Sequence, residues 1–181
     1  MKDLALHILD ILQNSVSAGA TLIKLQIDEI PDEDKYLVKF IDNGKGMDEE
    51  MVQHVTDPFF TTRTTRKVGL GLPLLKQNAE RTGGSLMIHS IPGKGTEVEA
   101  RFSFSHIDRL PTGDIAGTLA LTVSSCPAIN FIYTHTTPHG IFKFDTLEIK
   151  EELGELPISN PQVIAFMKDL INDNLKEIKA S

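Results

Sequence analysis

Three Gly-x-Gly pairs occur before residue 96, at positions 44/46, 69/71 and 93/95. Glycine lets a backbone approach a ligand closely, and N–H groups at a helix start can bind phosphate, although a single pair more often forms a tight turn or helix cap. None completes the dinucleotide-binding fingerprint Gly-x-Gly-x-x-Gly, because the position that requires the third glycine holds Glu49, Leu74 or Val98. The two GlyLys steps are followed by Gly rather than Ser or Thr, which excludes a Walker A loop, and the AspAsnGly run lacks the oxygen ligands of a calcium loop.

Two further groups of side chains are suited to phosphate chemistry. Asp10 and Asn14 stand four residues apart in a predicted helix, so they share one face. Arg63, Arg66 and Lys67 place three cations within five residues in a chain of net charge −7. They either neutralise a triphosphate or form a solvated basic loop, and their position next to a glycine pair favours phosphate contact.

Taken in order, these segments resemble the boxes of the GHKL ATPase superfamily, which includes histidine kinases, the gyrase ATPase domain, a heat-shock chaperone and the mismatch-repair ATPase. The matching segments are AspIleLeuGlnAsnSer (10–15) with AlaGlyAla (18–20), AspAsnGlyLysGlyMet (42–47), AspProPhePheThrThr (57–62), GlyLeuGlyLeu (69–72) and GlyLysGlyThr (93–96). The resemblance implies an α+β fold, a two-layer α/β sandwich of the Bergerat ATP-binding type, over residues 1–105. A smaller carboxy-terminal α/β extension would follow over residues 106–181.

The resemblance also implies Mg-ATP as the ligand. Asn14 would give a neutral oxygen to Mg²⁺, and Asp42 would accept a hydrogen bond from the adenine amino group, which selects ATP over GTP. Thr96 would complete the adenine contact, and Phe59 with Phe60 would anchor a nucleotide-dependent lid. The expected cofactor-binding residues are Asn14, Asp42, Gly44, Gly46, Met47, Phe60, Thr61, Thr62, Arg63, Arg66, Lys67, Gly69, Leu70, Gly71, Leu72 and Thr96.

Asp10 is the main departure from the family pattern. In the hydrolysing branches a glutamate four residues before the metal-binding Asn acts as general base, and here an aspartate stands in that position. Its side chain is shorter by one methylene, and a misplacement of about 1 Å can cost roughly a hundredfold in rate. We therefore expect slow hydrolysis, or a base that acts through an extra water. The alternative is that Asp10 is only a polar residue at the pocket rim.

The histidines give little support for autophosphorylation. None lies in a long helix followed by Glu and an apolar heptad, where a phosphoacceptor would be, so we expect at most the catalytic half of a histidine kinase. His135 and His139 flank a predicted hairpin turn, where local hydrogen bonds are more common than a metal site. We expect Cys126 to be a buried small hydrophobe.

Apolar periodicity predicts the elements that must position these residues. Helices are expected at 3–18, 48–55 and 70–82, and strands at 21–27, 36–41, 85–90 and 96–104. After residue 106 we expect a helix to about 125, a strand pair around the turn at 137–140, and two helices. Asn160 is expected to cap the last helix, with Pro161 in its first position. The tail either packs on the first unit or folds alone.

Composition limits the classes of partner. The chain has 181 residues, with 40% hydrophobic and 24% charged, as in an ordinary soluble globular protein, and its pI near 5.3 disfavours nucleic-acid or anionic-lipid binding. The single Cys126 excludes an intrachain disulfide and fits a reducing compartment. No apolar run reaches the roughly 20 residues of a membrane span. We expect a cytoplasmic protein that contacts neither nucleic acid nor membrane.

Two functions fit these features. In the first, the chain would be a stand-alone kinase that phosphorylates a partner protein, or a slow ATPase. In the second, ATP would order the lid, and the chain would be a nucleotide-gated interaction module without turnover. A DNA-processing ATPase fragment is disfavoured, because no basic transducer domain follows. Segments 105–109, 113–118 and 144–161 resemble a family of small ATP-binding proteins of anaerobic bacteria, often encoded beside iron-hydrogenase subunits. That resemblance implies a redox-enzyme or regulatory partner and leaves the oligomeric state open.

Overall fold

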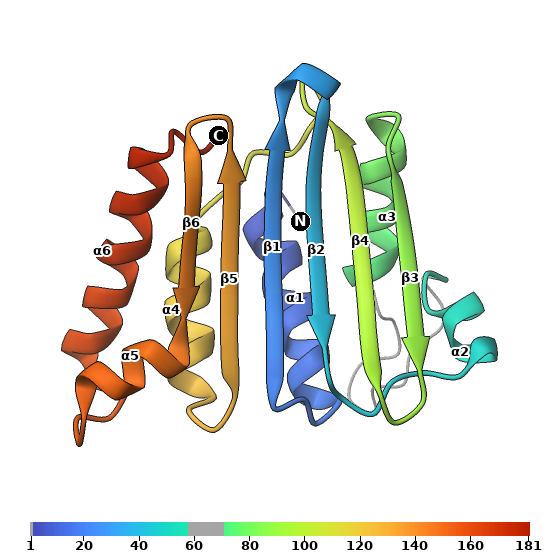
Figure 1. The fold of residues 1–181 in the computed structure, drawn as a ribbon. Coiled ribbons are helices and arrows are strands. Elements are labelled where there is room, and N and C mark those ends of the chain that lie inside the picture. The colour runs from blue at the N-terminus through green and yellow to red at the C-terminus, as the bar shows by residue number, and fades with distance from the viewer. Residues whose placement is uncertain (1, 58–70) are drawn as a thin grey trace.

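A six-stranded mixed sheet forms the centre of the computed structural model, which describes residues 2–57 and 71–181 (Figure 1). The strand order is β3-β4-β2-β1-β5-β6. The strands are β1 (Leu22–Ile30), β2 (Lys35–Asp42), β3 (Ser85–Ile91), β4 (Gly95–Ser103), β5 (Asn130–Thr137) and β6 (Gly140–Asp145). Neighbouring strands are antiparallel, except β1 and β5, which run parallel.

A layer of helices packs on one face of this sheet. The helices are α1 (Leu4–Ser17), α2 (Glu49–His54), α3 (Gly71–Arg81), α4 (Ile115–Ser125), α5 (Thr146–Leu153) and α6 (Pro161–Glu177), with a short 3₁₀ turn at Pro31–Glu33. Figure 1 shows α1, α3 and α4 behind the sheet and α6 beside β6. The two-layer α/β sandwich expected from the sequence is confirmed. Within the ranges that the structure describes, no helix has the length and apolar character to cross a membrane.

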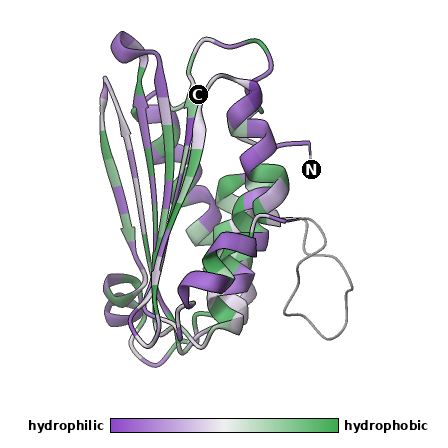
Figure 2. Ribbon diagram, turned by 90° about the vertical axis from the view of Figure 1, so that its right-hand side faces the viewer, coloured by the Kyte–Doolittle hydropathy of each residue, from purple (hydrophilic) through white to green (hydrophobic). Residues whose placement is uncertain are grey.

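The hydrophobic core lies between the sheet and the helix layer. On β1 the side chains of Ile23, Leu25 and Ile27 are buried, whereas Lys24 and Gln26 between them are exposed. Successive side chains of a strand point to opposite faces, so this alternation turns one face of the sheet to the core. Figure 2 shows this arrangement from the side, with the sheet and the helix layer facing one another.

The segment after residue 106 continues the same sheet. Helix α4 connects β4 to β5, and β5 lies along β1 with Tyr133 opposite Leu25. Buried residues from both parts of the chain belong to one hydrophobic cluster. The tail therefore packs on the first unit, which is one of the two arrangements that the sequence left open. The domain boundary at residue 105 stays a prediction.

Two local expectations have opposite outcomes. Asn160 caps α6 by accepting a hydrogen bond from the N–H of Gln162, and Pro161 occupies the first helical position, as predicted. The expectation of a buried Cys126 is wrong, because this residue is the C-cap of α4 and is half-buried. Its position at a helix end leaves one side open to solvent, while the other packs against the core.

Candidate functional site

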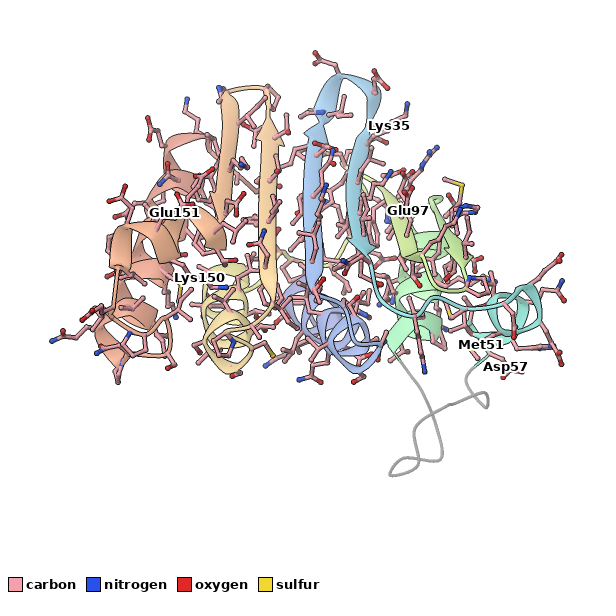
Figure 3. All side chains as sticks on the ribbon, turned by 60° about the horizontal axis from the view of Figure 1, so that its bottom comes forward. Lys35, Met51, Asp57, Glu97, Lys150 and Glu151 are labelled. Carbon is pink, nitrogen blue, oxygen red and sulfur yellow. The ribbon has the colours of Figure 1, made fainter. Side chains whose placement is uncertain are left out.

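The predicted site residues converge at the end of the sheet where β2 ends and β4 begins. Asp42 is the last residue of β2, and it lies directly opposite Thr96 of β4. Opposed side chains of an antiparallel pair point to the same face. Figure 3 turns this end of the molecule towards the viewer, with the α2 segment, marked by Met51 and Asp57, at the side of the sheet formed by β3.

Asp42 is held by hydrogen bonds to both carboxylate oxygens. The hydroxyl of Ser15, which is buried in α1, donates to Oδ2 over 2.7 Å. The backbone N–H of Gly44 donates to Oδ1 over 2.9 Å. A carboxylate oxygen can accept more than one hydrogen bond, so Asp42 keeps acceptor capacity while its orientation is set from two sides. Ser15 directly follows Asn14 in the first motif, but its role depends on a residue 27 positions away.

The loop after β2 requires glycine at two positions. A Cβ added to Gly44 would lie 2.9 Å from both the Cβ and the carbonyl oxygen of Ala18. Gly46 has a φ of +67°, and a Cβ there would lie 2.1 Å from the carbonyl oxygen of Ile91. The loop thus passes closely between the end of α1 and the turn from β3 to β4. This explains both glycines sterically, and their role in nucleotide binding stays a prediction.

The same loop is joined to the third glycine pair. The N–H of Gly93 donates to the carbonyl oxygen of Lys45 over 2.7 Å. The N–H of Met47 donates to Ser90 Oγ over 2.8 Å, and Ser90 Oγ lies 2.8 Å from Thr96 Oγ1. Two of the predicted boxes are therefore bonded to one another. Ser90 was missed from the sequence, because a serine near a strand end carries no signal of its own before the register is known.

Asn43 stabilises the loop after β2 through hydrogen bonds of its side chain. Its Oδ1 accepts hydrogen bonds from the N–H groups of Thr21 and Leu22, both over 2.9 Å. Its Nδ2 donates to Thr21 Oγ1 over 2.9 Å. The side chain therefore ties the loop after β2 to the start of β1. The AspAsnGly motif does not by itself indicate this contact, because Thr21 and Leu22 lie more than 20 residues earlier in the chain.

Helix α1 presents Asp10 and Asn14 one turn apart, as predicted, and both are partly buried. Asp10 lies against the first residue of α3, since a Cβ added to Gly71 would be 1.7 Å from Asp10 Oδ2. The second glycine of the middle pair thus opens α3, as expected. Leu72 is buried in the core, so only its backbone is available for a ligand.

His7 lies on the same helix, next to this contact, and is 1% exposed. Its Nε2 is 3.1 Å from Asn78 Nδ2 of α3, which links the two helices. Burial lowers the pKa of the imidazole below 6.5. His7 therefore acts as a neutral packing residue behind Asp10, a role that the sequence did not indicate.

His135 is placed at the opposite end of the sheet from the site. Its ring is fully buried, with Tyr133 Oη 2.6 Å from Nδ1 and Glu29 Oε1 2.8 Å from Nε2. The backbone N–H of Ser181 donates to the same Glu29 oxygen over 2.8 Å. Local hydrogen bonding, the more common role expected for this histidine, is what the structure shows.

The predicted lid residues and the first two residues of the second glycine box lie outside the described residues. They are Phe59, Phe60, Thr61, Thr62, Arg63, Arg66, Lys67, Gly69 and Leu70. Their proposed roles stay predictions. The residues that the structure does bring together are Asp42, Gly44, Gly46, Met47 and Thr96, with Asp10 and Gly71 meeting between α1 and α3.

A model of the "Histidine kinase-, DNA gyrase B-, and HSP90-like ATPase" family matches residues 2–106. The chain belongs to this family. The match covers the segment with all of the predicted boxes and ends at residue 106, where the predicted extension begins. The first part of the chain is therefore a GHKL ATP-binding module, as its motifs indicated.

Relatives of this ATPase module include histidine kinases. The chain is 35% identical over 91 residues to sporulation kinase D of Bacillus subtilis (strain 168), which covers 50% of this chain and 18% of the kinase. It is 33% identical over 85 residues to sensor histidine kinase YxdK of the same organism. This match covers 45% of this chain and 26% of that kinase. The chain thus spans well under two thirds of the length of these relatives.

A solved structure supports the fold beyond the ATPase module. The N-terminal domain of a DNA repair protein superposes with a TM-score of 0.54 over 80% of this chain and 52% of that chain. The sequence identity is 16%, so this similarity concerns the fold alone.

Proposed function

We propose that the chain binds Mg-ATP at the end of β2 and acts on its γ-phosphoryl group, transferring it to a partner protein or, slowly, to water. The position of Asp42 carries the proposal. Ser15 and Gly44 orient its carboxylate, and Thr96 lies opposite it on the neighbouring strand. An ionised carboxylate only accepts hydrogen bonds, so it suits the amino group of adenine and not the carbonyl of guanine.

The start of α3 is the proposed phosphate side of the site. Unpaired N–H groups and the positive end of the helix dipole favour anions at a helix N-terminus. Asp10 contacts this end through Gly71. In this position Asp10 would accept the proton of an attacking hydroxyl or water while the backbone N–H groups of α3 hold the phosphates.

Asn14 would hold the metal. Its side chain stands one turn after Asp10 on α1, and its amide oxygen is the hard, neutral donor that Mg²⁺ takes alongside phosphate oxygens. Few protein ligands are needed, because Mg²⁺ keeps several waters. The metal would supply charge neutralisation at the phosphates, and Asn14 would orient it towards α3.

Isothermal titration with Mg-ATP tests the binding step. We expect saturable binding by the unaltered chain and a loss of about tenfold to hundredfold in affinity in Asp42→Asn, because an amide N–H would face the adenine amino group. The matched control is Asp32→Asn, an exposed carboxyl in the turn at the other end of the sheet. Absence of ATP binding, or an unchanged affinity in Asp42→Asn, would contradict the proposal.

The second candidate is a nucleotide-gated interaction module. It is favoured by Asp10, which is shorter than the usual glutamate and is already in contact with Gly71, so its reach is limited. A steady-state phosphate-release assay separates the two functions. Turnover that disappears in Asp10→Ala supports the catalytic function, whereas ATP binding without turnover supports the gated module. In either function the acceptor or docking partner is a separate protein, proposed to be a redox-enzyme or regulatory protein.

A further inference from the structure

Ser90 is the third member of a row of polar side chains across three strands. It lies opposite Thr96 in the pairing of β3 with β4, and Thr96 lies opposite Asp42 in the pairing of β4 with β2. Directly opposed side chains in antiparallel strands share a face. Since Ser15 of α1 reaches Asp42, this face is the one that the helices cover.

The hydrogen bonds of Ser90 can be assigned completely. A serine hydroxyl has one proton to donate and two lone pairs. The N–H of Met47 donates to Ser90 Oγ over 2.8 Å, and the carbonyl oxygen of Gly95, which can only accept, lies 3.0 Å away. The third neighbour is Thr96 Oγ1 at 2.8 Å. All three contacts are satisfied only when Ser90 donates to Gly95 and accepts from both Met47 and Thr96.

This assignment sets the direction of the Thr96 hydroxyl. Its single proton points to Ser90, so the hydroxyl presents lone pairs alone to a ligand beside Asp42. The Asp42 carboxylate also offers only acceptors. The two side chains therefore match a group that donates hydrogen bonds, and a carbonyl placed there would leave acceptors facing each other.

We infer that Ser90 is a positioning and specificity-determining residue, which directs the Thr96 proton away from the base and makes the pocket prefer a 6-aminopurine to a 6-oxopurine nucleotide. The inference rests on the proposed function, because it concerns the same nucleotide site. Ser90 touches no ligand in this scheme; it acts through Thr96 and through the Met47 backbone.

The test compares Mg-ATP with Mg-ITP, which carries a carbonyl in place of the 6-amino group. In Ser90→Ala the Thr96 hydroxyl is free to donate, so we expect ATP affinity to fall about fivefold and the preference for ATP over ITP to fall about tenfold. Ser85→Ala, at the other end of β3, is the matched control and should keep both values. Ser90→Thr retains the hydroxyl and should keep the preference.

A second variant keeps the test decisive if Ser90→Ala does not fold. Thr96→Val removes the hydroxyl itself, so it should lower the preference for ATP by a similar factor, and adding Ser90→Ala should lower it no further. A folded Ser90→Ala or Thr96→Val protein with full preference would overturn the inference. If the unaltered chain binds neither nucleotide, the proposed function fails first, a result visible without any variant.

Discussion

Asp10 of α1 and Gly71 of α3 are in direct contact: a Cβ built on Gly71 would lie 1.7 Å from Asp10 Oδ2 and 2.7 Å from its Cγ. The glycine is required for space: Gly71 is the first residue of the α-helix α3, and a side chain there would overlap the Asp10 carboxylate. The contact brings a carboxylate to the start of α3, where the first N–H groups of a helix have no partner within the helix. It therefore joins the proposed base to the proposed phosphate site.

Gly71→Ala should displace the Asp10 carboxylate while leaving the fold intact. We expect ATP turnover to fall about tenfold to hundredfold, because a shift of about 1 Å misplaces the base. The free energy of unfolding should change by less than about 1 kcal/mol, since alanine favours the helix over glycine. Phosphate release at saturating ATP and urea unfolding measure the two quantities.

The control for Gly71→Ala is the same change in an Asp10→Ala background. With the carboxylate removed, the added methyl group has space, so the double variant should bind Mg-ATP as tightly as Asp10→Ala alone. A further loss of ATP affinity would mean that Gly71 acts through the backbone of α3 and not through Asp10.

Ser15→Ala should weaken ATP binding through Asp42. The Ser15 hydroxyl donates to Asp42 Oδ2 over 2.7 Å in a buried position, and its loss releases one side of the carboxylate. We expect ATP affinity to fall about fivefold, as for a hydrogen bond of about 1 kcal/mol. Ser17→Ala is the matched control, because that exposed hydroxyl on the same helix donates to the carbonyl of Gln13. Equal affinities in the two variants would refute the role of Ser15.

His7 should make stability depend on pH in the weakly acidic range. Burial holds its pKa below 6.5 in the folded state, so the unfolded chain binds a proton first as the pH falls. Its contribution is therefore fully present above about pH 6.5 and declines below it. Urea unfolding from pH 7.5 to 5 should show stability falling with pH, and His7→Gln, which cannot titrate, should reduce that slope. An unchanged slope in His7→Gln would show that other groups cause it.

Glu29 should affect stability at lower pH. Burial acts to raise the pKa of its carboxyl, but hydrogen bonds from His135 and Ser181 outweigh burial and hold it below 4.5. A lowered carboxyl pKa stabilises the fold above the unfolded value, and this stabilisation is lost as the pH falls through the folded one. Glu29→Gln should cost about 1–3 kcal/mol at pH 7 and flatten the decline below pH 4.5.

Urea unfolding at several pH values measures the Glu29 effect. The control is Glu50→Gln, which removes an exposed carboxyl from α2 and should leave both the stability and its pH profile nearly unchanged. If Glu29→Gln were as stable as the unaltered chain at pH 7, the buried contacts of Glu29 with His135 and Ser181 would not stabilise the fold.

Most element positions follow from local patterns in the sequence. The predicted helix at 3–18 is observed as Leu4–Ser17, and the helix at 70–82 as Gly71–Arg81. The predicted strand ends were less accurate than the predicted helix ends. Strand β1 extends to Ile30, three residues beyond its predicted end at 27. Pairing with β2 continues to Ile30, and the alternation alone does not reveal where a partner strand stops.

The family, the two-layer fold and the residue types of the proposed site could be predicted from the sequence, because glycine pairs, spaced polar residues and apolar periodicity are local signals. The orientation of these side chains could not be predicted, because it follows from how distant segments pack. Ser15 reaches Asp42, and Ser90 reaches Thr96, through strand register and helix packing. A hydrogen bond forms only when its donor and acceptor lie within about 3 Å of one another. The order of residues along the chain does not say which distant segments come that close.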